Sequence, residues 1–503
     1  MNNIPLLFLT DSYKLSHYKA YPKAEKLIAY GEFRTSYLKD PNDSRLIYYG
    51  MEYILENYLN KPITQEDLDK LDNFCQTHNV AYTSFPFPRD LFQKVINEHG
   101  GWFPIKLESL PEGEVVYPHV PVYQITATGE FSGLVTYLES LFTMVWYPST
   151  VATLSRRGKV LISKAFEKSV NPDNFYLIES RLHDFGFRGC TSIEQSIIGG
   201  SAHLLNFTGS DTIPACYYTQ SHLNDGKPVA TSIPASEHSV MTSYPTEREA
   251  LVKMIDEFGQ GIVACVMDSY DYVECLSKIL PTVQSLVLQK GGMLVIRPDS
   301  GDSIETVIQG LRAAEQVFGT TTNSKGYKVI NHCSVIQGDG IDLAILEKLL
   351  DKVLEEGFSA ENVAFGMGGG LLQKVNRDTL SFATKLSCVI SESGEVRDVM
   401  KFPKTDGGKI SLPGEFEVRL DDKNKTPLVY PKSESTTANE NLLKVVYDYG
   451  PVAHQKLKFK EIRDKLEVRW NELPCQHNPI SEAMELKKQA WLNSFNKADK
   501  QNL

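Results

Sequence analysis

Three glycine- and aspartate-rich segments constrain the fold of this chain, because each begins where an apolar run stops. They are LVIRPDSGD at 294–302, VIQGDGID at 335–342 and VAFGMGGGLLQK at 363–374. Apolar runs of this length are typical of buried strands, and in parallel α/β proteins the loops after the C-terminal ends of the strands meet in one crevice. The sequence therefore predicts parallel strands whose loops share one composite site.

The chain from 151 to 384 alternates between short apolar runs and helical stretches. Strand-like runs occur at 261–267, 293–296, 333–336 and 362–365. The helical stretches between them place apolar residues on one face, at Ile304, Val307, Ile308, Leu311, Ala314 and Phe318, and again at Leu343, Leu346, Leu349, Leu350, Val353 and Leu354. This alternation predicts an α/β domain over residues 151–384, built as a barrel or a doubly wound sheet.

The two ends of the chain differ from this middle part. Residues 1–150 are rich in Tyr, Phe and Pro and mix strand-like runs such as 122–128 with helical ones such as 51–59, which predicts an α+β segment. Residues 385–503 return to turn-rich, alternating stretches and finish with a charged, helix-prone tail. We expect residues 385–503 to pack against residues 1–150 in a second domain.

Composition and charge disfavour several classes of protein. The 503 residues are 42% hydrophobic, which is enough for a large core, and 63 acidic against 52 basic residues give a net charge of −11, which disfavours sequence-independent binding to nucleic acid. Eight cysteines without a C-x-x-C pair disfavour structural zinc and a disulfide framework. The N-terminus lacks the basic region of a signal peptide, and no segment reaches membrane length. We expect a soluble, cytoplasmic protein with reduced thiols.

Two of the loops carry candidate ligands for a sugar. In RPDSG, Asp299 suits a pair of ribose hydroxyls with Arg297 nearby, although P-D-S-G is also ordinary β-turn chemistry. In QGDGID, Gly338 and Gly340 let the backbone approach a ligand while Asp339 accepts a hydrogen bond from a hydroxyl. Two similar loops favour a functional interpretation over a pair of surface turns.

The third loop is a candidate phosphate site. GMGGG at 366–370 follows a strand and precedes LLQK, so its consecutive N–H groups are placed to cradle a phosphate at the start of a helix. The spacing of a Walker loop is missing, so nucleotide hydrolysis of that type is not supported.

One histidine is a candidate for chemistry. His238 follows Glu237 in IPASEHS, a segment with neither helical nor strand periodicity. A lone histidine is more often structural than catalytic. The carboxylates of Glu237 and of Asp268, which lies in the strand-end loop MDSYD, are able to orient the ring and raise its basicity, and this favours a catalytic role.

Nine separated motifs, in order along most of the chain, closely resemble the nicotinamide phosphoribosyltransferase family. They are DSYKLSHYKAYP (11–22), GEFR (31–34), HDFGFRG (183–189), GSDT (209–212), IPASEHS (233–239), MDSYD (267–271), IRPDSGD (296–302), VIQGDGID (335–342) and FGMGGGLLQKVNRD (365–378). The C-terminal hundred residues match only loosely. The resemblance implies a type II phosphoribosyltransferase: an irregular α/β barrel, a second domain built from both chain ends, and a homodimer with active sites at the subunit interface.

The resemblance also implies how the base is bound. Phe185 would stack on one face of the nicotinamide ring and Tyr13 of the partner subunit on the other, with Arg297 also facing the base. Asp211 would accept a hydrogen bond from the carboxamide. A carboxylate there repels the carboxylate of nicotinic acid, so the expected substrate is the amide rather than the acid.

For the second substrate, phosphoribosyl pyrophosphate (PRPP), the resemblance assigns ribose hydroxyls to Asp299 and Asp339 and the 5′-phosphate to Gly368 and Gly369. The pyrophosphate, bound to Mg²⁺, would be held by Arg188, Arg34, Arg377, Lys385 and Lys401, the last from the neighbouring chain. ATP would phosphorylate His238, oriented by Asp268 and helped by Glu237, and its hydrolysis would be coupled to the formation of nicotinamide mononucleotide in NAD salvage.

The chain departs from the family pattern at two positions. Ala383 stands two residues before Lys385, where a serine is common, and Ala264 stands near the amide site, where a serine is also frequent. The first departure puts one phosphate contact in doubt and the second a water-mediated contact to the base. Neither removes a charged group.

Three other functions remain open from the sequence. A nicotinate phosphoribosyltransferase would share the architecture, but Asp211 argues against it. A barrel aldolase or isomerase is disfavoured because no lysine of the barrel has an obvious Schiff-base setting. A non-catalytic binding protein is disfavoured because so many convergent charges are costly to keep without chemistry.

Overall fold

The computed structural model describes residues 4–403, 407–432, 434 and 438–501. The chain forms two compact units, which are described separately: unit 1 contains residues 1–150, 377–457 and 461–503, and unit 2 contains residues 151–376 and 458–460. The domain boundary expected after residue 384 lies after Asn376 in the structure. The reason is that strand β13 (Ala383–Ile390) pairs antiparallel with β1 (Lys26–Glu32), which places it in unit 1.

Unit 1 is organised by a six-stranded sheet in the order β14-β13-β1-β5-β3-β17. Its strands are β1, β13, β3 (Lys106–Ser109), β5 (Pro121–Thr128), β14 (Val396–Asp398) and β17 (Lys444–Asp448). Smaller antiparallel pairs join β2 (Leu46–Tyr48) to β4 (Glu114–Val116) and β15 (Phe416–Leu420) to β16 (Pro427–Pro431). Because β1 lies between β5 and β13 and is buried except at Lys26, the N- and C-terminal parts of the chain share one core.

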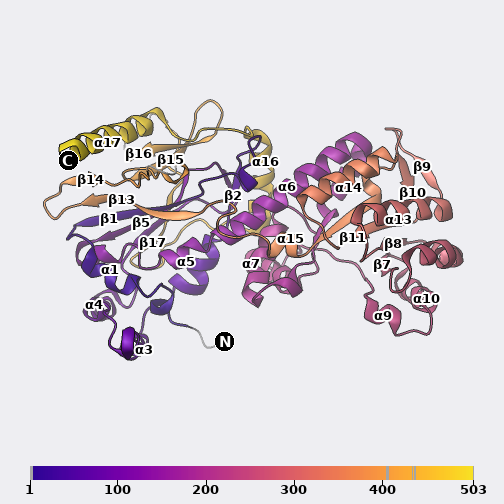
Figure 1. The fold of residues 1–503 in the computed structure, drawn as a ribbon, viewed down its shortest axis with the longest axis horizontal. Coiled ribbons are helices and arrows are strands. Elements are labelled where there is room, and N and C mark those ends of the chain that lie inside the picture. The colour runs from indigo at the N-terminus through magenta and orange to yellow at the C-terminus, as the bar shows by residue number, and fades with distance from the viewer. Residues whose placement is uncertain (1–3, 404–406, 433, 435–437, 502–503) are drawn as a thin grey trace. The chain divides into compact units, whose positions relative to one another are not determined.

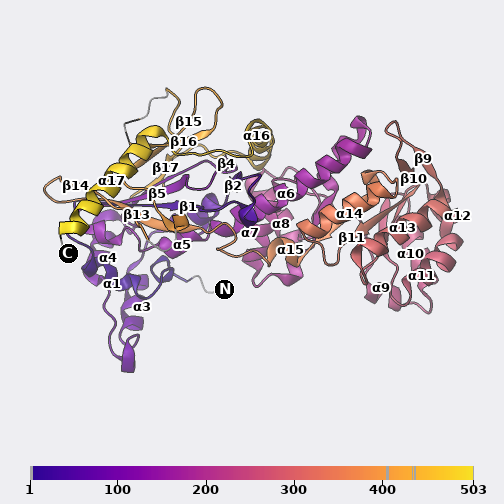
Figure 2. The same ribbon diagram turned by 45° about the horizontal axis from the view of Figure 1, so that its top comes forward.

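Helices cover this sheet and its pairs. They are α1 (Lys14–Ala20), α2 (Met51–Ile54), α3 (Gln65–Cys75), α4 (Arg89–His99), α5 (Glu139–Thr143), α16 (Phe459–Glu472) and α17 (Glu482–Gln501). The helix-prone C-terminal tail predicted from the sequence is α17, which lies beside β16 (Figure 2). Helix α6 (Trp146–Ser169) begins in unit 1 and continues into unit 2.

Unit 2 contains a five-stranded parallel sheet in the order β6-β12-β11-β8-β7. The strands are β6 (Leu182–Asp184), β7 (Ile262–Val266), β8 (Met293–Arg297), β11 (Cys333–Gln337) and β12 (Val363–Met367). The last four agree with the predicted apolar runs. A short antiparallel pair, β9 (Thr320–Thr322) and β10 (Lys328–Ile330), lies outside this sheet.

Two short extended segments join the free edges of the parallel sheet. The segment 208–211 pairs with β6, since Asp184 N–H donates to Gly209 O at 3.2 Å. The segment 231–236 pairs with β7, since Ala264 N–H donates to Pro234 O at 3.0 Å. The two segments also pair with each other, at Gly209 and Thr231. Unit 2 is therefore a ring of parallel elements closed by irregular pairing, which confirms the predicted irregular α/β barrel.

Helices lie outside this ring, with α13 and α14 beside β11 in Figure 1. The helices of unit 2 are α7 (Ile193–Leu204), α8 (Ile213–Tyr218), α9 (His238–Thr242), α10 (Glu247–Phe258), α11 (Tyr272–Glu274), α12 (Leu280–Lys290), α13 (Ser303–Phe318), α14 (Leu343–Glu355) and α15 (Gly369–Leu372). The second aspartate of two loop motifs starts a helix: Asp302 accepts the N–H groups of the first turn of α13, and Asp342 does the same for α14. The first aspartates, Asp299 and Asp339, are thereby left for the site.

All eight cysteines are free, as expected from their spacing, and Cys475 is the exposed one. Across the part of the chain that the structure describes, no helix combines the length and the hydropathy required to cross a bilayer.

Candidate active site

The candidate active site lies at the C-terminal ends of the parallel elements of unit 2. The predicted residues there are Phe185 after β6, Asp211 at the end of the 208–211 segment, Asp268 after β7, Asp299 after β8, Asp339 after β11, and Gly368 and Gly369 after β12. Parallel elements open their C-terminal ends on the same side of a sheet or barrel. The fold therefore brings these loops, which are far apart in the sequence, to one end of the ring.

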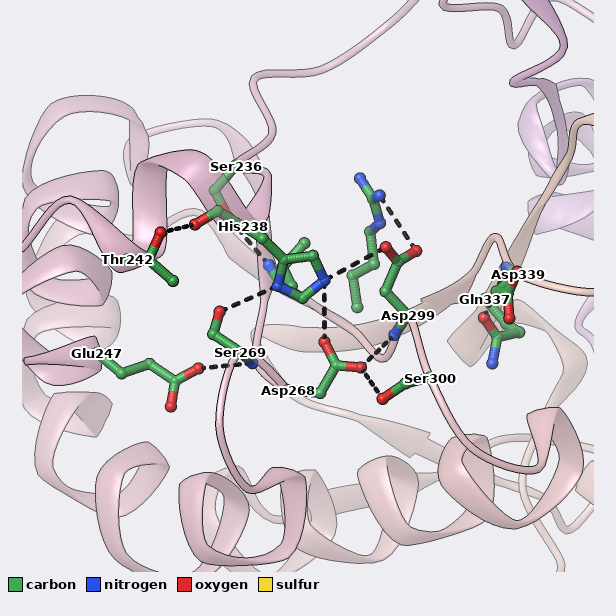
Figure 3. Close-up of polar contacts among 12 residues, drawn as sticks. Ser236, His238, Thr242, Glu247, Asp268, Ser269, Asp299, Ser300, Gln337 and Asp339 are labelled. Carbon is green, nitrogen blue, oxygen red and sulfur yellow. Dashed lines mark hydrogen bonds and ion pairs between the residues drawn. The ribbon is translucent and has the colours of Figure 1, made fainter. Parts of the chain in front are cut away.

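His238 is the first residue of α9, and its ring lies between two carboxylates and a hydroxyl (Figure 3). Nε2 is 3.4 Å from Oδ2 of Asp299 and 3.8 Å from Oδ1 of Asp268, while Nδ1 is 3.2 Å from Oγ of Ser269. The His238 side chain is 45% exposed, whereas that of Asp268 is 2% exposed. An imidazole with carboxylates on one side and solvent access on the other can keep one N–H and offer its second nitrogen to a ligand.

Asp268 ties two strand-end loops together. Its Oδ2 accepts the Asp299 N–H at 2.9 Å and the Ser300 hydroxyl. Its Oδ1 is buried, with the His238 ring opposite it and no hydrogen bond in place. A buried carboxylate oxygen without a hydrogen bond is costly, so a small shift of the imidazole that donates its N–H to Asp268 is favourable. Asp268 therefore lies within reach of His238, and its orienting role stays a prediction.

Asp299 joins Arg297 to the histidine. Oδ1 of Asp299 accepts from Nη2 of Arg297 at 3.3 Å, and Oδ2 faces His238. The Arg297 guanidinium carbon in turn lies 5.9 Å from the centre of the Phe185 ring. Asp299 thus contacts both the histidine and the guanidinium that lies near the aromatic ring.

Phe185 packs inside the closed set of parallel elements, at its C-terminal end, against a core cluster of Ala264, Val295 and Ile336. Its ring packs on two glycine faces: a Cβ on Gly366 would come within 2.0 Å of the ring, and one on Gly338 within 2.9 Å. The sequence predicted that Gly338 lets the backbone approach a ligand. In the structure the phenyl ring occupies that space, so Gly338 is needed to seat Phe185. Ala264 belongs to the apolar support of the same ring.

Asp211 stands beside Phe185 because their segments are neighbours in the ring. The Asp211 N–H donates to the backbone oxygen of Asp184, the residue before Phe185, at 3.0 Å. The exposed Asp211 carboxylate accepts the Ser232 hydroxyl at 2.5 Å, which orients Oδ1. An aromatic ring and an oriented carboxylate therefore share one edge of the site, as base recognition requires.

The glycine loop begins a helix of one turn. Gly368 precedes α15, whose first N–H groups have no carbonyl partner within the helix. A Cβ on Gly370 would lie 2.5 Å from Ile341 O, whereas one on Gly369 would make an ordinary contact at 3.5 Å with Gln373 Oε1, so Gly369 is the less crowded of the two. Asp339 is exposed and lies apart from His238 in Figure 3, with its N–H held by Gln337 Oε1 at 3.0 Å. This geometry suits a phosphate at Gly369 and a hydroxyl at Asp339.

Two predicted residues lie away from the histidine cluster. Glu237 is exposed, and its carboxylate accepts the hydroxyl of Ser239 on its own helix. The chain enters α9 in an extended conformation at this residue, and the role of Glu237 beside the imidazole stays a prediction. Arg188 is exposed in the turn Phe187–Gly189 that follows Phe185.

The remaining predicted residues, Tyr13, Arg34, Arg377, Lys385 and Lys401, belong to unit 1. Burial lowers the pKa of Lys385, the charge of Glu139 opposes this, and the charges of Arg34 and Lys401 lower it further. Three cations close enough to perturb one another form a natural site for a polyanion, which would relieve their mutual repulsion.

Further contacts within unit 1 orient these side chains. Arg34 is held by Ser381, to whose O and Oγ it donates at 2.8 and 3.1 Å. Tyr13 is 55% exposed, with its ring edge-on to His17. Arg377 is exposed, with Nη2 3.4 Å from Oδ1 of Asp378. Ser381 supplies a hydroxyl near the position where Ala383 lacks one.

The sequence did not single out Ser269, Ser232, Glu247 and Asp184. Ser269 and Asp184 stand inside motifs that were noticed, MDSYD and HDFGFRG, but their links to the site reach other segments: Ser269 contacts His238, and the backbone oxygen of Asp184 accepts the Asp211 N–H. Glu247 lies on α10, where its Oε1 accepts the Ser269 N–H at 3.3 Å, and nothing in its local sequence marks it. Such supporting residues are recognised by contact rather than by motif.

Comparison with known proteins assigns the family. Residues 180–450 match the nicotinate phosphoribosyltransferase (NAPRTase) family, and residues 5–107 match the N-terminal domain of nicotinamide phosphoribosyltransferase. A nicotinamide phosphoribosyltransferase of Xanthomonas campestris pv. campestris (strain 8004) is 39% identical over 424 residues, which cover 83% of this chain and 88% of that protein. The chain belongs to the nicotinate and nicotinamide phosphoribosyltransferase family. It is an enzyme of the pentosyltransferase class, and the resemblance inferred from the motifs is confirmed.

Other relatives extend the similarity over the whole length. A nicotinamide phosphoribosyltransferase of Acinetobacter baylyi (strain ATCC 33305 / BD413 / ADP1) is 28% identical over 491 residues, covering 91% of this chain and 96% of that protein. Human nicotinic acid phosphoribosyltransferase has the same fold, with a TM-score of 0.62 and 18% identity over 97% of this chain and all of that one. A nicotinate-nucleotide pyrophosphorylase from Pyrococcus furiosus has a TM-score of 0.60 and 16% identity, and the match covers 94% of this chain and 97% of that one. These structures confirm the predicted fold class.

Proposed function

We propose that this enzyme is a nicotinamide phosphoribosyltransferase, which transfers the 5-phosphoribosyl group of PRPP to nicotinamide and yields nicotinamide mononucleotide and pyrophosphate for NAD biosynthesis. The family and the names of its relatives support the reaction class. The choice of base rests on one observation, the oriented carboxylate of Asp211 beside Phe185.

Asp211 distinguishes an amide from an acid by charge. The carboxamide of nicotinamide donates an N–H to a carboxylate, whereas the carboxylate of nicotinic acid meets a like charge, which costs several kcal/mol when both are removed from water. Phe185 supplies a flat apolar surface for the ring, and the guanidinium of Arg297 stands near it. The base site thus favours a flat, uncharged ligand with an amide donor.

The resemblance to the family names candidate partners for the sugar and phosphates of PRPP. We propose that Asp299 and Asp339 accept the ribose hydroxyls and that Gly368 and Gly369 donate backbone N–H groups to the 5′-phosphate. The pyrophosphate partners would be Arg188, Arg34, Arg377, Lys385 and Lys401. The ring nitrogen of nicotinamide forms a bond to C1 of the ribose as the bond from C1 to pyrophosphate breaks, and positive charge develops on the sugar near Asp299. The protein acts mainly by positioning the reactants and neutralising charge.

Mg²⁺ would arrive with the substrate. In the described ranges, no group of three or more His, Cys, Asp or Glu side chains is arranged to hold a metal ion. Mg²⁺ in phosphoryl and pyrophosphate chemistry is commonly held by one or two carboxylates together with substrate phosphates. We therefore propose that the pyrophosphate carries Mg²⁺ into the site and leaves with it.

The environment of His238 suits a phosphohistidine. With one ring N–H held by Asp268 or Asp299, the lone pair of the other nitrogen attacks the γ-phosphorus of ATP, and ADP leaves. Water later cleaves the bond between nitrogen and phosphorus and releases phosphate. Because Asp299 faces both His238 and the ribose position, phosphorylation of the ring changes the charge next to the sugar, which would couple ATP hydrolysis to transfer.

We further propose a cytoplasmic homodimer with shared active sites, in which Tyr13 and Lys401 of the partner subunit complete the site built by unit 2. The exposed Tyr13 ring supports this, because an exposed aromatic ring gains from stacking on a bound base.

The deciding experiment combines the purified protein with nicotinamide, PRPP, Mg²⁺ and ATP and measures the mononucleotide formed. We expect product, with faster turnover of nicotinamide than of nicotinic acid. Faster turnover of nicotinic acid would favour a nicotinate phosphoribosyltransferase, the activity for which the human protein of the same fold is named. A folded dimer that forms no product from either base would favour a non-catalytic binding protein.

A further inference from the structure

Asp184 supports both residues of the base site. It is the last residue of β6, directly before Phe185, and is fully buried. Its Oδ1 accepts the Gly186 N–H at 2.7 Å and so holds the turn that follows Phe185. Its backbone oxygen accepts the Asp211 N–H at 3.0 Å. One buried residue therefore joins the ring that faces the base to the carboxylate that faces the amide.

The Asp184 carboxylate is placed in an unfavourable environment. Oδ2 is buried with no hydrogen-bond partner in the described residues. It packs against Gly200 of α7, where an added Cβ would lie 3.0 Å from Oδ2. Burial raises the pKa of Asp184 to about 6, the Gly186 N–H and the nearby Thr212 hydroxyl oppose this, and the charge of Asp211 raises it further. The two carboxylates thus feel each other's charge.

Three other titratable groups near Asp184 are neutral near pH 7. Burial raises the pKa of the thiols of Cys190, after the Phe187–Gly189 turn, and Cys216, on α8, and both respond to the charge of Asp184. Burial lowers the pKa of His183, its neighbour on β6. These three groups supply no positive charge, so an ionised Asp184 adds to the negative potential at Asp211.

We propose that Asp184 is a second specificity-determining carboxylate of the base site, which positions Phe185 and Asp211 and, when ionised, adds its charge to the exclusion of an anionic ring substituent. The inference rests on the proposed function, since it concerns the base chosen by that site. Asp184 is anionic above about pH 6 and neutral below it. Discrimination against nicotinate, whose carboxylate stays ionised over this range, therefore grows as the pH rises through about 6.

The test measures the inhibition constant of nicotinate divided by the KM of nicotinamide, from about pH 5 to about pH 8. In the native protein we expect this ratio to rise by about fivefold or more, as for two like charges that interact near a protein surface. Asp184→Asn keeps the shape of the side chain without its charge, so its ratio should be lower and independent of pH. Glu112→Gln is the matched control, because Glu112 is a partly buried carboxyl of unit 1 whose pKa burial raises to about 7. It should keep the native profile.

If the ratio of the nicotinate inhibition constant to the nicotinamide KM does not change with pH in the native protein, the proposal is overturned, whether or not Asp184→Asn folds. An Asp184→Asn enzyme that retains the native pH profile would also overturn it, as would a Glu112→Gln enzyme that loses this profile as Asp184→Asn does. Product formation from nicotinamide is scored separately at each pH. Its absence contradicts the proposed function, whereas product with a flat ratio contradicts only the role of Asp184.

Discussion

Replacing Gly366 by alanine tests whether the glycines beneath Phe185 set the position of its ring. Gly366 lies within β12, and a Cβ there would stand 2.0 Å from Cδ2 and Cε2 of Phe185. Ordinary contacts begin near 3.4 Å, so the ring must move by about 1.4 Å. The backbone resists this movement, because the Phe185 N–H donates to Met367 O at 3.1 Å and Asp184 holds the next residue.

Two effects of known size follow from this displacement. An added methyl group in a well-packed site lowers the free energy of unfolding by about 1 to 3 kcal/mol. A misplacement of about 1 Å in a group that positions substrate reduces the rate by up to roughly 100-fold. For Gly366→Ala we therefore expect the KM of nicotinamide to rise roughly 10-fold to 100-fold, while the KM of PRPP stays nearly unchanged, because the change acts on the surface that meets the base.

Steady-state kinetics against each substrate, together with urea unfolding, provide the assay. Gly261→Ala is the matched control: it adds the same methyl group in unit 2, but its nearest neighbour would be Phe258 O at 3.9 Å, so native values are expected. Native stability and native KM for nicotinamide in Gly366→Ala would refute the reasoning. Equal rises in the KM of both substrates would show that the ring does not act on the base alone.

Three other experiments test the proposed mechanism. His238→Ala should keep slow transfer but lose stimulation by ATP and labelling from γ-labelled ATP; undiminished labelling would place the phosphate elsewhere. Asp211→Asn should raise the turnover rate of nicotinate relative to that of nicotinamide by about 10-fold to 100-fold. Asp302→Asn is the control and should leave this ratio unchanged, because asparagine caps α13 as well as aspartate does. Phe185→Ala and Tyr13→Ala chains are each expected to be inactive alone. When the two are mixed at random, about a quarter of all active sites should contain both native residues and regain activity. No recovery would exclude a site shared between subunits.

Local sequence patterns were sufficient to predict the repeating part of the fold. The runs that became β7, β8, β11 and β12 are apolar, and the stripes that became α13 and α14 have helical period, so each element follows from its own residues. Asp299 and Asp268 were found for the same reason, since a carboxylate directly after a buried strand can only lie at the end of the sheet.

The closure of the ring and the supports of the site were decided by tertiary structure. The segments 208–211 and 231–236 have little strand character, and they are extended because the edges of β6 and β7 offer them backbone partners. Gly338 was predicted to meet a ligand, but the ring of Phe185, from about 150 residues earlier in the chain, fills that space. Glu237 was predicted to help His238, and in the structure its carboxylate accepts the hydroxyl of Ser239.

The sequence alone thus determined which elements form, their order, and which polar residues stand at their ends, because these depend on periodicity and on neighbours within a few positions. The tertiary structure decided which ends meet, which glycines make room for Phe185, and that Asp184 lies buried behind Asp211. Those outcomes depend on the contacts and solvent exclusion of side chains distant in the chain, and a buried charge acquires its properties from surroundings that no local pattern contains.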